Sequence, residues 1–160
     1  MSRIAAEIVD VYVFRRRGER GEYLQVRRAA HEMLPGTWQA IHGRIEPSEK
    51  AFQTALRELR EETQLVPLNL YQIDHVNTFY MARDDTVHHC PCFAAEVADD
   101  AEPQLNAEHD AWRWLAFDEA RESFLWPGQR RALDEIRQEI VGNGPAVAYL
   151  RIDLPDVLRP

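Results

Sequence analysis

The stretch His42–Pro67, HGRIEPSEKAFQTALRELREETQLVP, decides how this sequence is interpreted, because it gathers acidic residues in a chain whose net charge is already −8. Ser48, after Pro47, is a good helix N-cap. Beyond it, apolar residues recur at the three- and four-residue spacing of an amphipathic helix, namely Ala51, Phe52, Ala55, Leu56 and Leu59. The pattern predicts a helix that ends near Thr63 or Gln64.

Three glutamates project from the side of this helix opposite the apolar residues. Glu58 and Glu62 are i, i+4 neighbours, and Glu58 and Glu61 are i, i+3 neighbours. Like charges at this spacing destabilise a helix, and Arg57 and Arg60 offset this only in part. A divalent cation would offset it better, because Mg²⁺ prefers carboxylate oxygens and also takes substrate phosphates. The simpler alternative is a solvated helix face of mixed charge, which is ordinary for an isolated RELREE.

The spacing of residues from Gly43 to Leu65 distinguishes a metal site from a solvated helix face. It resembles the signature of the Nudix hydrolases, G-x5-E-x7-R-E-U-x-E-E-x-G-U, in which U is a bulky aliphatic residue. Counted from Gly43, every position matches except the second glycine, where this chain has Gln64. Either Gln64 adopts a left-handed conformation at a cost of about 1 kcal/mol, or the helix exit differs from the family pattern. No carboxylate of the signature is lost.

The resemblance implies a hydrolase that binds Mg²⁺ or Mn²⁺ and cleaves a nucleoside diphosphate linked to another group by attack of water on phosphorus. The implied metal ligands are the Gly43 carbonyl, Glu58 and Glu62, and Glu61 is either a further ligand or lies just outside the ligands. Arg57 is expected to pair with Glu49 and to hold the loop against the helix. The general base varies in this family, so Glu61 and Glu108 are both candidates. Glu108 begins an EH segment before a Trp-rich strand, as in many family members; the alternative is a polar loop residue.

Substrate contacts are also implied by the resemblance. Arg27 and Arg28 end the predicted strand YLQVRR, where similar sequences have a phosphate-binding arginine, and one of the two is expected to point inward. Trp38 is a candidate stacking partner for a heterocycle, although such aromatic residues are more often part of the core. Tyr80 lies 15 residues after Leu65, a distance that members acting on dinucleoside polyphosphates often show.

The WQ before the glycine and the EH segment look most like the branch of dATP or dihydroneopterin triphosphate pyrophosphohydrolases. This implies cleavage of a nucleoside or pterin triphosphate to a monophosphate and pyrophosphate. Dinucleoside polyphosphates and nucleoside-diphosphate sugars stay as alternative substrates. Two other classes of function are weaker: a non-catalytic nucleotide-binding module, which often lacks a carboxylate that this chain has, and an interaction domain.

The remaining sequence predicts an α/β or α+β fold, with a mixed β-sheet sandwiched between α-helices, in a single domain of residues 1–160. Strands are expected at residues 6–17, 23–28, 38–43, 70–82, 86–97 and 111–117, and helices at 118–125 and 127–142. Pro91 indicates a sheet edge or a bulge. Residues 145–160 are expected to hold a last strand or an arm, packed on this chain or on a partner.

Composition argues against two kinds of partner, nucleic acids and membranes, whereas the resemblance implies a small nucleotide or nucleotide-like molecule. The net charge of −8 argues against a general nucleic-acid binder. No apolar run reaches the roughly 18 residues of a membrane helix, and the N-terminus does not resemble a signal peptide, so a cytoplasmic protein without a membrane partner is expected. A homodimer is an expectation from the family alone.

The segment HHCPC (88–92) offers four zinc donors within five residues. Alternate residues of a strand face opposite ways, so one site made of all four is disfavoured. Cysteines buried in the sheet are the expected alternative.

Overall fold

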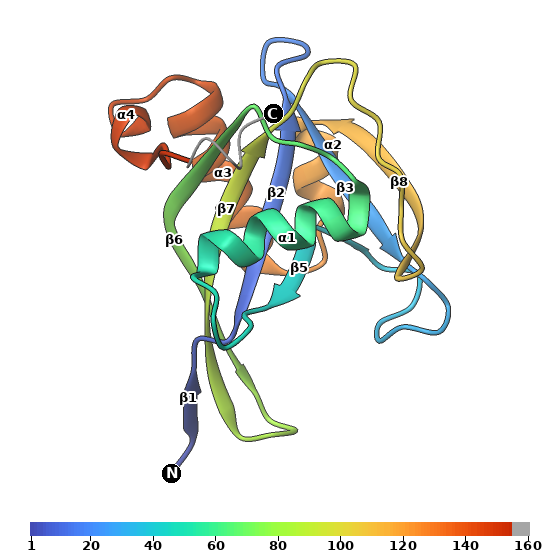
Figure 1. The fold of residues 1–160 in the computed structure, drawn as a ribbon, viewed down its shortest axis with the longest axis vertical. Helices are drawn as coiled ribbons and strands as arrows, with labels where there is room; N and C mark the ends of the chain where they lie inside the picture. Colours follow the sequence, from blue (N-terminus) through green and yellow to red (C-terminus); the bar gives the residue numbers. More distant parts are fainter. Residues whose placement is uncertain (155–160) are drawn as a thin grey trace.

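The structure is a computed structural model that describes residues 1–154. These residues form one eight-stranded mixed sheet with helices on both faces (Figure 1). The strands are β1 (Arg3–Ala5), β2 (Ile8–Arg15), β3 (Glu22–Arg28), β4 (Trp38–Gln39), β5 (Ile41–Arg44), β6 (Asn69–Met81), β7 (Thr86–Glu96) and β8 (His109–Ala116). The helices are α1 (Ala51–Thr63), α2 (Phe117–Ser123), α3 (Pro127–Glu135), the π-helix η1 (Ile136–Val141) and α4 (Val147–Leu150).

Strand β2 separates two apolar layers. Val9, Val11 and Val13 face one way and pack with apolar residues of α1, including Leu59, whereas Tyr12 and Phe14 face the other way and pack with α2, α3 and η1. The two-residue period of a strand produces this division, because successive side chains point to opposite faces. The predicted sandwich of a mixed sheet between helices is confirmed. Residues 1–154 contain no helix with the length and apolar character needed to cross a membrane.

The two ends of α1 differ in how well the sequence predicted them. The helix begins at Ala51, so the expected N-cap at Ser48 is wrong. The chain makes an additional turn, in which the Glu49 amide donates to the Glu46 carbonyl at 2.9 Å, and this turn delays the helix. At the other end, Gln64 has φ +57° and its amide donates to the Arg60 carbonyl. Gln64 therefore adopts the left-handed conformation in which glycine is favoured.

A bulge interrupts the pairing of β6 and β7. Gln72 pairs with Phe93 and Val76 pairs with Pro91, so three residues of β6 oppose one residue of β7. Two amides freed by the bulge, those of Asp74 and His75, donate to the carboxylate of Glu135 at 2.5 and 3.0 Å. Strand β7 lies inside the sheet, so Pro91 does not mark an edge. It lies next to the bulge instead, which is the other expectation for this proline.

The ends of the chain differ from expectation. The short strand β1 pairs in parallel with β7, an element that no sequence pattern indicated. Residues 145–154 form the single turn α4 and an isolated bridge from Arg151 to Tyr71, so the expected last strand is wrong and an arm is the better description. The π-helix η1 follows α3 within the expected helix 127–142. The part of the C-terminal expectation at 155–160 lies outside the described residues.

Candidate active site

The first glycine of the signature lets α1 lie directly against β5. Ile41 and Gly43 face α1, and His42 between them faces the opposite side of the sheet. A Cβ on Gly43 would overlap Cγ, Cδ and Oε1 of Glu58. Only glycine therefore leaves room for the Glu58 side chain against the strand, and the Gly43 backbone lies next to that carboxylate.

Arg57 holds the loop before α1 in place. Its Nε and Nη2 donate to the two oxygens of Glu49 at 2.8 and 3.0 Å, and Nη2 also donates to the Arg44 carbonyl. Thr54 donates a further hydrogen bond to Glu49. The Arg57 hydrogen bonds lower the pKa of Glu49 to about 2, so this carboxylate stays ionised. The predicted Arg57–Glu49 pair is confirmed.

Arg57 also reaches two of the predicted metal ligands. Its Nη1 donates to Glu58 at 2.7 Å and to Glu61 at 3.2 Å. Glu58 is largely buried, and burial raises its pKa, whereas the Glu61 side chain is exposed. The guanidinium therefore compensates the outer carboxylates of the cluster.

Glu62 has no such compensation. Its side chain is 1% exposed, and neither carboxylate oxygen has a hydrogen-bond partner. Burial, together with the nearby charges of Glu108 and Glu58, raises the pKa of Glu62 to about 9, although Arg28 and the His42 backbone partly oppose this shift. His109 Nδ1 lies 3.5 Å from Oε2, but burial lowers the pKa of His109 to about 4, so the ring is neutral at pH 7. A buried carboxylate without a partner is costly, and a cation is the natural means of compensation.

Glu108 approaches the same space from a loop. The Asn106 amide donates to the Glu62 carbonyl at 3.2 Å, which docks the loop on the C-terminal end of α1. The Asn106 side chain donates to Glu108, and Arg28 Nη1 lies 3.9 Å from the Glu108 carboxylate. Glu108 is close enough to raise the pKa of both Glu58 and Glu62. The expected approach of this glutamate from outside the helix is confirmed; its role in catalysis stays a prediction.

The carboxylates surround one space without touching. Within residues 1–154, no three of them have oxygens that all lie within 4.8 Å of one another. Mutual repulsion and the hydrogen bonds from Arg57 account for this separation. The site nevertheless fits a divalent cation on two observations: the unpartnered buried oxygens of Glu62 and the close fit of Glu58 against Gly43.

The two arginines at the end of β3 face opposite ways. Arg28 lies on the α1 face, where it pairs with Glu32 at 3.0 Å and faces Glu108. Arg27 lies on the other face and pairs with Asp110 at 2.6 Å. The prediction that one of the pair points toward the site is confirmed, and Arg28 is that residue.

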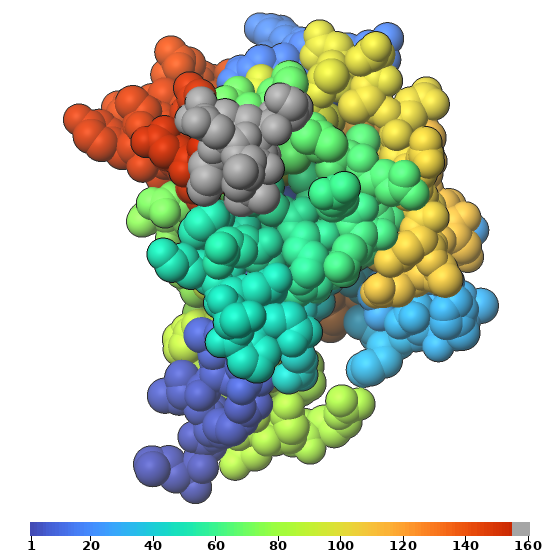
Figure 2. All heavy atoms as spheres, viewed as in Figure 1, coloured from blue at the N-terminus to red at the C-terminus, as the bar shows by residue number. Residues whose placement is uncertain are grey.

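The predicted aromatic contacts are more scattered. The guanidiniums of Arg113 and Arg27 lie over the Trp38 ring at 3.9 and 5.7 Å from its centre. Tyr80 donates to Asp85 in the turn of the β6–β7 hairpin, and no contact joins it to the carboxylates. Figure 2 shows the molecule notched beside α1, between the light-blue loop after β3 and the yellow-green hairpin tip.

Sequence reasoning missed two residues of this region. His109 contacts Glu62, and Arg113 covers Trp38. His109 and Arg113 both lie on β8 and are four residues apart, so regular strand alternation would place them on the same face of the sheet. The position of His109 at the irregular start of β8 could not be read from alternation.

Comparison with known proteins agrees with this geometry. The sequence model of the NUDIX domain matches residues 6–136. An octanoyltransferase of Myxococcus xanthus is 36% identical over 126 residues, which are 78% of this chain and 35% of that protein, so the chain spans about a third of its length. A pig bis(5'-nucleosyl)-tetraphosphatase (asymmetrical) is 35% identical over 106 residues, 63% of this chain and 70% of the pig enzyme.

Among solved structures, the E. coli dihydroneopterin triphosphate pyrophosphohydrolase superposes with a TM-score of 0.67 and 21% identity, covering 87% of this chain and 99% of that one. This likeness shows the shared fold. The family match covers the strand, loop and helix that carry the carboxylates. The chain therefore belongs to the NUDIX family.

Proposed function

We propose that this protein hydrolyses a phosphoric anhydride bond in a small nucleotide-like substrate with the help of Mg²⁺ or Mn²⁺. The observation that carries the proposal is the buried, unpartnered carboxylate of Glu62, surrounded by Glu58 and Glu108. A solvated helix face, the simpler alternative, would leave this carboxylate in water. It is instead buried where only a cation or a proton can compensate it.

The chain's own residues then have distinct roles. The Gly43 carbonyl, Glu58, Glu61 and Glu62 would hold the cation. Bound there, a divalent cation neutralises phosphate charge and acidifies the attacking water. Arg28 is placed to donate to phosphate oxygens, since its side chain faces the carboxylates. Arg57 and Glu49 act as positioning residues that fix the loop and the helix relative to each other.

Glu108 is the better of the two candidates for the general base. It comes from a separate element, its side chain is about half exposed, and Arg28 lies at the long distance of 3.9 Å. Each glutamate accepts one hydrogen bond at 3.2 Å, but the donor to Glu61 is the charged guanidinium of Arg57, whereas the donor to Glu108 is the neutral amide of Asn106. A base must be free to accept the proton of the attacking water.

The substrate class is inferred from relatives. Identity of 35% to an asymmetrical bis(5'-nucleosyl)-tetraphosphatase favours a dinucleoside polyphosphate, the class that sequence patterns ranked second. The second candidate is a nucleoside or pterin triphosphate, favoured by the Trp38–Gln39 pair before β5 and the Glu108–His109 pair before β8. The Trp38 ring, with arginines over it, is a candidate platform for a base or for its phosphates.

A substrate panel tests the proposal. Purified protein is incubated with Mg²⁺ and diadenosine tetraphosphate, dATP, dihydroneopterin triphosphate or ADP-ribose, and products are separated by anion exchange. Hydrolysis in ¹⁸O-water then identifies the phosphorus that is attacked. The first candidate predicts ATP and AMP from diadenosine tetraphosphate, and the second predicts pyrophosphate release from a triphosphate.

Two variants make the panel decisive. Glu62→Gln should lower turnover by roughly 100-fold or more, whereas Glu46→Gln, which changes an exposed glutamate of the loop before α1, should retain it. Metal-independent turnover, or equal activity of the two variants, would contradict the assignment of the site.

A further inference from the structure

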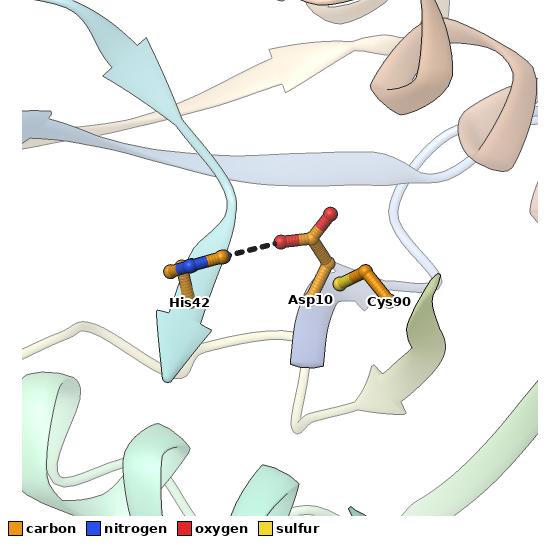
Figure 3. Close-up of side chains that lie close together, drawn as sticks. All are labelled: Asp10, His42 and Cys90. Atoms are coloured by element: carbon orange, nitrogen blue, oxygen red, sulfur yellow. Dashed lines mark hydrogen bonds and ion pairs between the residues drawn. The ribbon is translucent and has the colours of Figure 1, made fainter. Parts of the chain in front are cut away.

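A second cluster of metal-binding side chains lies on the opposite face of the sheet from α1. Asp10, His42 and Cys90 each place a ligand atom within 4.8 Å of the other two, and they are the one such group found within residues 1–154. Figure 3 shows the Asp10 carboxylate between the other two side chains, with the Cys90 sulfur turned toward it. These residues have no part in the reaction proposed above.

Three neighbouring strands fix the cluster. Asp10 on β2 is the cross-strand partner of His42 on β5 and of Cys92 on β7. Cys90 lies two residues before Cys92 and therefore on the same face of β7. Because the ladders on both sides of β2 hold the three Cα atoms, the donors are preorganised by the central sheet and do not depend on a loop.

Burial makes the cluster unusual. Asp10 is 4% exposed and Cys90 is fully buried. Asp10 Oδ1 is hydrogen-bonded to His42 Nδ1 at 2.7 Å, and Oδ2 accepts a long hydrogen bond of 3.5 Å from the Tyr12 hydroxyl. The Cys90 thiol also interacts with this carboxylate. A buried carboxylate is stable when it is paired or when it coordinates a metal. The His42 side chain is 43% exposed, which gives solvent a route to the cluster.

The donor set selects the kind of cation. Magnesium prefers oxygen ligands alone, whereas one carboxylate oxygen, one imidazole nitrogen and one thiolate sulfur suit zinc and related borderline-soft metals. A tetrahedral zinc ion holds its ligand atoms roughly 3.3 to 3.6 Å apart, from the usual bond lengths. The ligand atoms already lie within 4.8 Å of one another, and the His42–Asp10 distance of 2.7 Å must open slightly to admit the ion.

We propose that Asp10, His42 and Cys90 bind a borderline-soft divalent cation, with Zn²⁺ as the representative ion, at a second metal site separate from the carboxylates of α1. The Cys90 thiol releases its proton to solvent on binding, and the sulfur donates the electron pair that forms the metal bond. Three protein ligands leave a fourth position for water or another small ligand. The proposal does not depend on the proposed hydrolase activity.

The proposed site also shows which donor of the segment HHCPC (88–92) could bind a metal. Of its four candidate donors, only Cys90 joins the cluster. His89 points to the other face and contacts Thr78, and His88 stacks on Phe79. The zinc ligands proposed here come from three strands far apart in the sequence, so their spacing carries no recognisable motif.

Cobalt titration tests the proposal directly. Co²⁺ is added to the full-length reduced protein in excess Mg²⁺, which occupies hard oxygen sites. We expect a near-ultraviolet sulfur-to-cobalt absorption at one equivalent, which Zn²⁺ removes by competition. Cys90→Ser should lose this absorption, and the matched control Cys92→Ser, a buried cysteine two residues away, should retain it. Absence of the band in the wild type, or its loss in Cys92→Ser alone, would overturn the proposal.

Surface variants keep the test valid if Cys90→Ser fails to fold. His42→Ala should weaken Co²⁺ binding by more than about tenfold, the scale of a lost ligand or its support. His89→Ala, a histidine on the other face of β7, should leave the affinity unchanged. Equal affinities in these two variants would show that Asp10 and His42 form only a hydrogen-bonded pair.

Discussion

The two ends of the acidic site on α1 are built on opposite principles. At the Arg57 end, the Glu49 carboxylate receives hydrogen bonds from Arg57 and Thr54, and its pKa falls to about 2. At the Glu62 end, a more deeply buried carboxylate has no hydrogen bond, and its pKa rises to about 9. The contrast separates carboxylates that hold the structure together from those that are kept for a ligand.

The largest effect should come from Glu62. Glu62→Gln is expected to lower kcat by roughly 100-fold or more, the scale of losing one charged group that stabilises a transition state. Steady-state kinetics with saturating Mg²⁺ measure this loss. If the variant keeps wild-type kcat, the distinction between the two ends has no functional meaning.

The same variant should be more stable than the wild type in EDTA. Because the folded pKa of Glu62 is about 9 and its ordinary value is 4.5, the unfolded state loses its proton first as the pH rises. The contribution of Glu62 to the stability of the folded state is therefore most favourable below about pH 4.5, and it declines as the pH rises toward 9. Urea unfolding across this range should show wild-type stability falling relative to Glu62→Gln, by about 1–3 kcal/mol at pH 8. A parallel pH dependence would contradict the burial argument.

Glu108 tests whether a carboxylate outside α1 takes part in the reaction, because it lies near Glu62 but belongs to the loop before β8. Glu108→Gln is expected to reduce kcat by about 100-fold, a typical effect of losing a general base. Glu61→Gln should have a smaller effect, since Arg57 already binds that carboxylate. A larger loss in Glu61→Gln would exchange the two roles.

Gly43 tests how tightly the site is packed. The added methyl group of Gly43→Ala meets the Glu58 side chain and must displace it. We expect kcat to fall about tenfold and stability to fall by about 1–3 kcal/mol, as in other overpacked sites. Arg44→Ala, the next residue on β5, is the control and should change little. Unchanged kinetics in Gly43→Ala would mean that Glu58 need not lie against β5.

The smallest effect concerns the helix end. Gln64 has φ +57°, where a side chain is strained. Gln64→Gly should raise the free energy of unfolding by up to about 1 kcal/mol without changing kcat, because no group of the site is altered. Thermal unfolding measures the gain, and a loss of stability would show that the Gln64 side chain makes a compensating contribution.

The sequence predicted the sheet, α1 and the Arg57–Glu49 pair, because strand alternation, helical spacing and a signature act over short distances. It failed at the start of α1, where the turn at Glu46–Glu49 competes with Ser48 as a cap. It also could not reveal the isolation of Glu62 or the meeting of Asp10 with Cys90. Both features depend on which strands and loops become neighbours in the fold, and local sequence patterns do not determine that.

Manganese binding shows whether the Glu62 carboxylate is a ligand of the cation. Electron paramagnetic resonance of free Mn²⁺, titrated with wild-type protein and with Glu62→Gln, measures affinity without any substrate. We expect Glu62→Gln, although folded and more stable in EDTA, to bind Mn²⁺ at least about tenfold more weakly than the wild type. Equal affinity in the two proteins would show that the buried, unpartnered carboxylate is not a ligand of the cation.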